Sequence, residues 1–244
     1  MVVLSMSPSE MYKNLAADDA KIKIKRQQLE PKVIKKFKKT ARFPVLELFE
    51  YTIPSSLNLY ILYFYAENQQ AVEKPVFDIY AVMFDQNERI IIKWGCSPYQ
   101  HTPSDPYIFT PRVDLYSSHF FHRYKERISG NQKLSTNEVI CMYFIRNPHA
   151  LPMKLNEDIK RNYRKYGEFA DYGMTVQDGI CLLIRYVVVG YFDEDAQKEN
   201  VEAIGCVYGT FLNHGMLAVT QKDAIQKENI RYLNELFKEI RPLL

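Results

Sequence analysis

The middle of the chain carries the hydrophobic pattern of β-strands. Four segments rich in β-branched and aromatic residues alternate with polar turn sequences, and the strands predicted from them cover residues 45–52, 57–65, 76–84 and 89–94. Residues 96–110 contain three prolines and are predicted to form a loop, with a short strand expected at 113–116. Two further apolar segments, 179–192 and 201–212, flank an acidic loop and predict a β-hairpin.

Helical spacing dominates the two ends of the chain. Residues 8–40 predict two helices, the first capped by Ser7 or Ser9 and the second beginning near Pro31, because proline suits the first turn of a helix. A periodic apolar stripe from about Thr220 to Ile240 predicts a C-terminal amphipathic helix. Between these ends, Ser135-Thr-Asn-Glu138 has the spacing of a capping box and predicts the start of another helix.

This order of elements predicts an α+β fold, with a mostly antiparallel sheet and flanking helices. We expect a basic helical arm over residues 1–42 and a single α+β domain over 43–244. That domain would have a strand-rich part at 43–110 and a helix–helix–hairpin–helix part at 111–244. A chain of 244 residues, 47% of them hydrophobic, is long enough to bury the core of such a domain.

The charge is spread unevenly along the chain. Residues 1–42 hold 11 Lys or Arg against 4 Asp or Glu, whereas the whole chain has a formal net charge of only +3. A basic segment on a mildly acidic body favours contact with nucleic acid, with an acidic partner or with a second copy of the chain. The alternative is a solvated helix whose lysines only keep it in water.

Several function classes lack their motifs. Neither G-x-G-x-x-G nor G-x-x-x-x-G-K-[ST] occurs, so dinucleotide and P-loop chemistry are not expected. The four cysteines contain no C-x-x-C spacing and are predicted to be free, buried thiols in a reducing, cytoplasmic compartment. The apolar run at 179–192 is broken by Arg185 and falls short of a membrane span of about 20 residues. We therefore expect no cofactor, no metal and no membrane contact.

The segment from Tyr116 to Ile128 separates two kinds of side chain on a predicted helix. One stripe is apolar and suited to the core, and its members are Phe120, Phe121, Tyr124 and Ile128. An adjacent stripe at i, i+4 and i+8 consists of His119, Arg123 and Arg127. Ser117 or Ser118 is suited to cap this helix.

The polar stripe suits phosphodiester chemistry. Cleavage of RNA by its own 2′-hydroxyl needs a proton acceptor near neutral pH and cations that hold the phosphate, which His119 and the two arginines supply. An alternative is structural, with His119 packed on the preceding strand and Arg123 paired with Glu126. A metal site at His119 and His122 needs at least a third ligand, which no recognised spacing supplies.

The stretch Ser-Ser-His119-Phe-Phe-His-Arg123-Tyr-Lys-Glu-Arg127, followed by Leu134-Ser-Thr-x-Glu-Val139, resembles the opening of toxin-like nucleases of the barnase–EndoU–colicin–RelE superfamily. The resemblance covers residues 113–217. It implies two helices before an antiparallel sheet and a late strand that ends in a threonine-containing motif, here Gly209-Thr-Phe-Leu212. It further implies acid–base work for His119, phosphate binding by Arg123 and Arg127, and substrate positioning by Thr210.

Two other places carry candidate chemistry. His214 follows the hairpin and would bring a second imidazole toward Thr210, although Asn213-His-Gly is equally a turn. A basic and aromatic cluster with RNA-stacking potential consists of Tyr163, Arg164 and Lys165. The sequence as a whole favours a metal-independent RNA-cleaving or RNA-binding protein. A non-catalytic interaction protein is the alternative.

Overall fold

The computed structural model describes residues 1–86, 88–99, 108–129, 133–155, 170–193, 198–217 and 219–240. Nine strands form one sheet in the order β1-β2-β3-β4-β5-β9-β8-β7-β6. Neighbouring strands run antiparallel except β5 and β9, which are parallel. The strands are β1 (Val45–Thr52), β2 (Leu59–Ala66), β3 (Val76–Asp85), β4 (Glu88–Tyr99), β5 (Ile108–Tyr116), β6 (Leu151–Lys154), β7 (Tyr172–Val176), β8 (Gly179–Asp193) and β9 (Lys198–Asn213).

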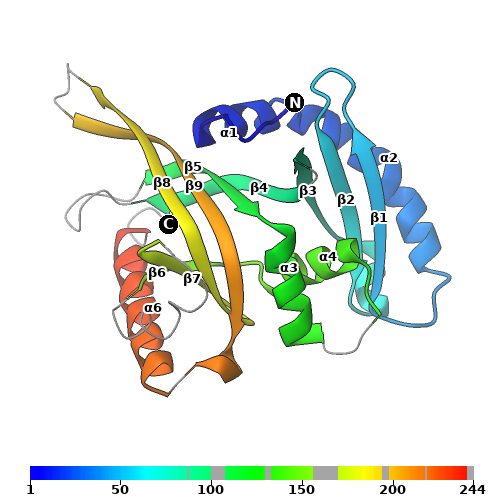
Figure 1. The fold of residues 1–244 in the computed structure, drawn as a ribbon. Coiled ribbons are helices and arrows are strands. Elements are labelled where there is room, and N and C mark those ends of the chain that lie inside the picture. The colour runs from blue at the N-terminus through cyan, green and yellow to red at the C-terminus, as the bar shows by residue number, and fades with distance from the viewer. Residues whose placement is uncertain are drawn as a thin grey trace.

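Helices cover both faces of this sheet (Figure 1). They are α1 (Pro8–Ala16), α2 (Asp19–Phe37), α3 (Ser118–Tyr124), α4 (Thr136–Arg146) and α6 (Val219–Ile240). Buried residues of α1 and α2 pack with β2 to β5 on one face. Those of α3 and α4 pack on the other face with β2 to β5 and with β7, β8 and β9. A third, smaller cluster joins α6 to β6, β8 and β9. Helices α3 and α4 therefore lie between the two halves of the sheet.

Strand β2 shows why its sequence is almost wholly apolar. Ile61 and Tyr63 pack in the cluster under α3 and α4, whereas Tyr60, Leu62 and Phe64 pack in the cluster under α1 and α2. A strand covered on both faces needs apolar side chains at successive positions rather than at alternate ones. The expectation of a central strand here follows from that physical requirement.

The predicted α+β class with a mostly antiparallel sheet is confirmed. The predicted strands at 45–52 and 76–84, the hairpin and the C-terminal helix are present within a few residues of their expected bounds. The capping box at Ser135 and Glu138 is also present, with both hydrogen bonds formed. Both strand-rich parts of the chain belong to one sheet, because the parallel pair β5–β9 joins them.

The prediction that a second helix begins at Pro31 is wrong. Helix α2 runs from Asp19 to Phe37 with Pro31 in its interior. Ile22, Leu29 and Val33 are all buried against the sheet, whereas Pro31 faces solvent. Tertiary packing on both sides of the proline therefore outweighs the loss of one backbone hydrogen bond within the helix.

The loop predicted at 96–110 is too long. Strand β4 continues to Tyr99 and β5 begins at Ile108, while residues 100–107 lie outside the described residues. Proline is tolerated near strand ends, and Pro98 occupies such a position in β4. Cys96, expected to be buried, is exposed and its thiol lies 3.6 Å from the Tyr12 hydroxyl. The segment 147–177, which has little pattern, contains two strands that were not predicted, β6 and β7.

The basic N-terminal segment is helical and forms a layer of the domain. Met11 and Leu15 of α1 and Val33 and Phe37 of α2 are buried in the same cluster as the sheet. Between the two helices, Asp18 is 2% exposed and accepts hydrogen bonds from the side chains of Ser56, Asn58 and Tyr60. Within the described residues, no helix is long and apolar enough to cross a membrane.

Candidate functional site between α3 and the end of β9

Helix α3 is fixed by its apolar stripe and its N-cap. Ser117 accepts a hydrogen bond from the backbone N–H of Phe120 and caps the helix. Phe120, Phe121 and Tyr124 are buried, as their spacing predicts. Because these residues anchor one side of the helix, the neighbouring stripe turns outward, and His119 at its start is exposed.

The middle of the polar stripe is an exposed ion-pair cluster. Arg123 Nη1 lies 3.0 Å from Glu126 Oε2, and His122 Nδ1 lies 3.4 Å from Glu126 Oε1. The hydrogen bond from Arg123, followed by the charge of His122, lowers the pKa of Glu126. The pairing of Arg123 with Glu126 is the contact expected under the structural alternative. Since this pair is exposed, it leaves the guanidinium accessible to a ligand.

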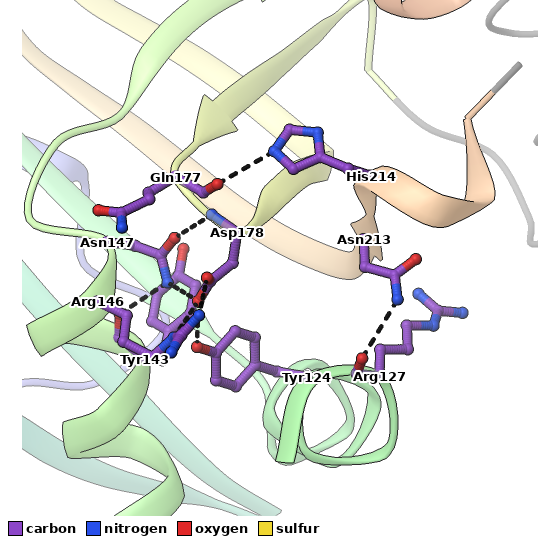
Figure 2. Close-up of polar contacts among 9 residues, drawn as sticks. All are labelled: Tyr124, Arg127, Tyr143, Arg146, Asn147, Gln177, Asp178, Asn213 and His214. Carbon is purple, nitrogen blue, oxygen red and sulfur yellow. Dashed lines mark hydrogen bonds and ion pairs between the residues drawn. The ribbon is translucent and has the colours of Figure 1, made fainter. Parts of the chain in front are cut away.

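Arg127 belongs to a different local structure. Residues Lys125–Ser129 (η2) form one turn of π-helix after α3, a distortion that is often found at functional sites. The Asn213 side chain, at the end of β9, donates a hydrogen bond to the Arg127 carbonyl at 3.2 Å. Figure 2 shows the Arg127 side chain extending toward the Asn213 amide. The end of β9 is thereby fixed against the last turn of the helix.

His214 follows Asn213 directly, at the start of the turn η4 (His214–Met216). Its Nε2 atom lies 3.0 Å from the Gln177 carbonyl oxygen, between β7 and β8. A carbonyl only accepts hydrogen bonds, so Nε2 must carry the proton and donate it. In the neutral imidazole, Nδ1 is then the basic nitrogen, and the His214 ring is exposed.

A buried carboxylate holds the turn that positions Gln177 (Figure 2). Asp178 is next in sequence, is 7% exposed, and accepts hydrogen bonds from Tyr124 at 2.5 Å, from Arg146 Nε at 2.8 Å and from Asn147 at 3.1 Å. Burial acts to raise the pKa of Asp178, but the hydrogen bonds from Arg146, Tyr124 and Asn147 outweigh it and the pKa is lowered. The network ties the β7–β8 turn to α3 and α4.

Gly179 completes this turn for a steric reason. A Cβ atom at residue 179 would lie 2.0 Å from the Leu212 carbonyl oxygen, so only glycine permits this approach of β8 to β9. Thus the turn Gln177-Asp178-Gly179 is held from two sides, by the carboxylate network and by the backbone of β9.

The structure brings together some predicted site residues and separates others. Arg127 and His214 lie on either side of Asn213, at one end of β9. His119 lies eight residues before Arg127, which corresponds to roughly 12 Å along a helix. Thr210 is 5% exposed and pairs with Leu182 of β8, whose side chain packs in the α6 cluster. Because paired residues point to the same face, Thr210 faces away from α3.

The remaining predictions concern the RNA-stacking cluster and the possible metal ligands. Tyr163, Arg164 and Lys165 lie outside the described residues. No group of three or more His, Cys, Asp or Glu side chains within the described ranges is arranged to hold a metal ion. His122, considered above as a metal ligand with His119, contacts Glu126 instead.

Sequence reasoning missed the residues that position this site: Asn213, Gln177 and Asp178. The Asp178-Gly179 dipeptide before a strand is a recognisable turn signal, and it would have placed a turn here. Its contact with Tyr124 and Arg146, which are 54 and 32 residues away, has no signal in the local sequence.

Comparison of the chain with protein-family models, curated proteins and solved structures gives no match. The arrangement of the residues themselves is therefore the basis for any function assigned to this site.

Proposed function

We propose that this protein is a metal-independent RNA-cleaving or RNA-binding protein whose site lies between α3 and the end of β9. One observation carries the proposal: adjacent residues Asn213 and His214 bind the carbonyls of Arg127 and Gln177. These two contacts hold an oriented imidazole and the backbone of Arg127 at one end of one strand. This combination suits a phosphodiester whose 2′-hydroxyl must lose a proton.

In the proposed reaction, His214 Nδ1 accepts the proton of the 2′-hydroxyl. The 2′-oxygen forms a bond to phosphorus, the bond from phosphorus to the 5′-oxygen breaks, and the 5′-oxygen takes a proton from solvent. Arg127 binds the phosphate oxygens, where a guanidinium offers two parallel N–H donors to the developing charge. The proton and the negative charge are both accounted for without a metal ion.

Asn213 supports this role in a second way. Its amide oxygen is buried and has no hydrogen-bond partner among the described residues. Buried polar atoms are nearly always paired in folded proteins. Under this proposal, a hydroxyl or amino group of a bound ligand donates to that oxygen.

The rest of the α3 stripe would bind the strand on either side of the reacting phosphate. Arg123 and His119 continue the polar face away from Arg127, and both reach solvent. The roughly 12 Å of helix between His119 and Arg127 leaves room for more than one nucleotide along this face. His119 is therefore proposed as a strand contact, and His214 as the base.

The order of elements is a further argument. Helices α3 and α4 precede four strands, β6 to β9, that pair in antiparallel fashion. The toxin-like nucleases that the sequence resembles also place two helices before an antiparallel sheet. This succession of elements is compatible with the resemblance on which the proposal draws.

A second candidate function rests on α2. Exposed lysines lie on this helix and just after its end, and four of them form no side-chain hydrogen bond or ion pair with a described residue: Lys23, Lys32, Lys35 and Lys39. They lie on the opposite face of the sheet from α3. A non-catalytic protein that binds an acidic partner through this basic arm is the alternative to an RNA-cleaving one.

The test is incubation of the purified protein with 5′-labelled single-stranded RNA in excess EDTA. Parent protein, His214→Ala and His119→Ala are compared, with His122→Ala as a control imidazole on the same helix. We expect His214→Ala to lower the cleavage rate by about 10²–10⁴-fold, the usual contribution of a positioned general base. Products ending in a 2′,3′-cyclic phosphate would identify the 2′-hydroxyl as the nucleophile.

Two outcomes would count against the proposal. Equal cleavage by the parent and His214→Ala would remove His214 from the reaction. The second outcome is that neither the parent nor any variant cleaves or binds RNA, while replacing Lys23, Lys32, Lys35 and Lys39 with alanine abolishes binding to an acidic partner. In that case the interaction function replaces the RNA-cleaving one.

A further inference from the structure

A second site lies at the junction between the two halves of the sheet. A cleft of about 700 Å³ opens beside β4 and β5, under the connection from α4 to β6 and one side of α6. Its polar lining consists of Lys93, Ser97, Arg112, Asp114, Asn147 and His149. The volume is typical of small-molecule sites. Neither Arg127 nor His214 lines it, so the cleft is separate from the α3–β9 site.

The floor of the cleft is a nearly buried ion pair. Arg112 Nε lies 2.8 Å from Asp114 Oδ1, and Arg112 Nη2 donates to the Tyr208 hydroxyl at 2.8 Å. The two charged side chains are only 13% and 17% exposed. Removing both charges from water is costly, and an apolar pair would fill the same space more stably. The pair is therefore better explained by binding than by stability.

Part of this ion pair remains available to a ligand. Nη1 of Arg112 takes part in neither of these two hydrogen bonds. The Asp114 carboxylate has about four acceptor positions, more than its bonds to Arg112 Nε and to the Cys206 thiol use. The cleft thus presents N–H donors and carboxylate acceptors side by side.

Gly95 provides the space in front of this pair. It lies directly opposite Arg112 in the β4–β5 ladder, so both point to the same face. A Cβ atom at residue 95 would meet nothing within 4 Å. The missing side chain leaves room for a flat group against the β4 backbone.

The remaining walls are aromatic. Tyr116, Tyr143 and Phe144 line the cleft, and the Lys93 ammonium lies 4.9 Å from the centre of the Phe144 ring. Aromatic walls favour a planar ligand that stacks. Lys93, which also pairs with Asp78, and the exposed His149 offer N–H donors to a polar substituent on that ligand.

We propose that this cleft binds a guanine base, held by the Arg112–Asp114 pair. Guanine presents acceptors at O6 and N7, which arginine binds, and N–H donors at N1 and N2, which a carboxylate accepts. Adenine offers the reverse pattern at position 6 and lacks the N2 donor. The inference does not depend on RNA cleavage, because the base belongs either to a free nucleotide or to a single-stranded RNA.

The test is titration calorimetry of the full chain with GMP, AMP and UMP. We expect GMP to bind at least tenfold more tightly than AMP or UMP. Gly95→Leu fills the cleft from an exposed strand position and should lower GMP affinity more than tenfold. Val188→Leu, which adds bulk on exposed β8, should leave affinity unchanged, and thermal unfolding of each variant checks the fold.

Arg112→Lys retains a positive charge beside Asp114 but removes the forked donor, and should abolish the preference for GMP over AMP. Equal affinities for the three nucleotides, or unchanged GMP binding by Gly95→Leu, would overturn the proposal. Titrating a guanine-containing and a guanine-free RNA tetranucleotide distinguishes the two sources of the base. The same titrations on His214→Ala keep this result apart from the proposed cleavage, since that variant should bind GMP normally.

Discussion

The two ends of the α3 stripe look alike in sequence and differ in their surroundings. At the His119 end, the side chain is exposed, and the ion pair next along the stripe joins Arg123 to Glu126, only three residues away in sequence. At the Arg127 end, three segments distant in sequence meet: the π-turn, the end of β9 and the β7–β8 turn. Only the second end is held by contacts that a surface helix would not make on its own.

This difference teaches where chemistry can be positioned. An imidazole on an exposed helix surface rotates among several rotamers, whereas His214 has one ring nitrogen fixed by a backbone carbonyl. A reacting group must be held in a defined geometry by its own neighbours. The comparison therefore favours His214 over His119 as the base, although the sequence pattern points first to His119.

The largest effect on stability should come from the Asp178 carboxylate, in the β7–β8 turn that meets the Arg127 end of the stripe. Asp178→Ala removes the acceptor for Tyr124, Arg146 and Asn147, and should lower the free energy of unfolding by about 3 kcal/mol, because it leaves buried donors without a partner. Urea unfolding followed by circular dichroism measures this. Glu126→Ala removes only the exposed carboxylate that pairs with His122 and Arg123, and should leave the urea midpoint unchanged. Equal losses in both variants would contradict the distinction between the two ends.

Acid should weaken the same network. The pKa of Asp178 is lower in the folded protein than the ordinary value of about 3.9. A group whose pKa is depressed by folding adds stability above its unfolded pKa and loses it as the pH falls through the folded pKa. The urea midpoint of the parent should therefore drop more steeply below about pH 4 than that of Asp178→Asn. Parallel profiles for the two proteins would show that Asp178 is not the titrating group.

A smaller effect is expected at Asn213. Asn213→Ala removes the donor to the Arg127 carbonyl and should cost about 1 kcal/mol in unfolding free energy, the usual net value of one hydrogen bond. It should also slow RNA cleavage, because Arg127 is no longer fixed to the end of β9. Asn200→Ala, at the other end of the same strand, serves as the control and should leave cleavage unchanged.

The smallest effect should be at the His119 end. His119→Ala removes an exposed side chain and should weaken RNA binding less than about threefold, since one exposed charge contact is worth under 1 kcal/mol. Fluorescence anisotropy with a labelled oligonucleotide measures this affinity. A loss of cleavage as large as that of His214→Ala would reverse the assignment and return the base to His119.

Sequence patterns located most elements because each pattern has a local physical cause. The capping serines Ser117 and Ser135 satisfy backbone donors of their own helices, so the sequence near them is enough. The apolar stripe of α3 follows from helical geometry in the same way. The prediction at Pro31 was wrong because a proline inside a helix removes a backbone hydrogen bond, which is a local effect. The packing of α2 on the sheet offsets that loss, and it comes from distant residues.

The sequence indicated only some of the residues of the candidate site. Arg127 and His214 stood out by residue type, but their relation depends on Asn213 and Gln177, which are ordinary polar residues in turns. The cleft beside β4 and β5, for which we propose guanine binding, had no sequence signal at all. Arg112 and Gly95 lie just outside the predicted strands at 113–116 and 89–94, and only the β4–β5 register places them opposite each other.

By itself, the sequence determined the class of the fold, the faces of α3 and the residue types available for chemistry, because these depend on spacing within one element. The tertiary structure alone decided which of those residues meet. It joined the two halves of the sheet through the parallel pair β5–β9, and it brought the β7–β8 turn against α3 and α4. Such contacts link residues far apart in the chain, and their free energy comes from packing that no local pattern records.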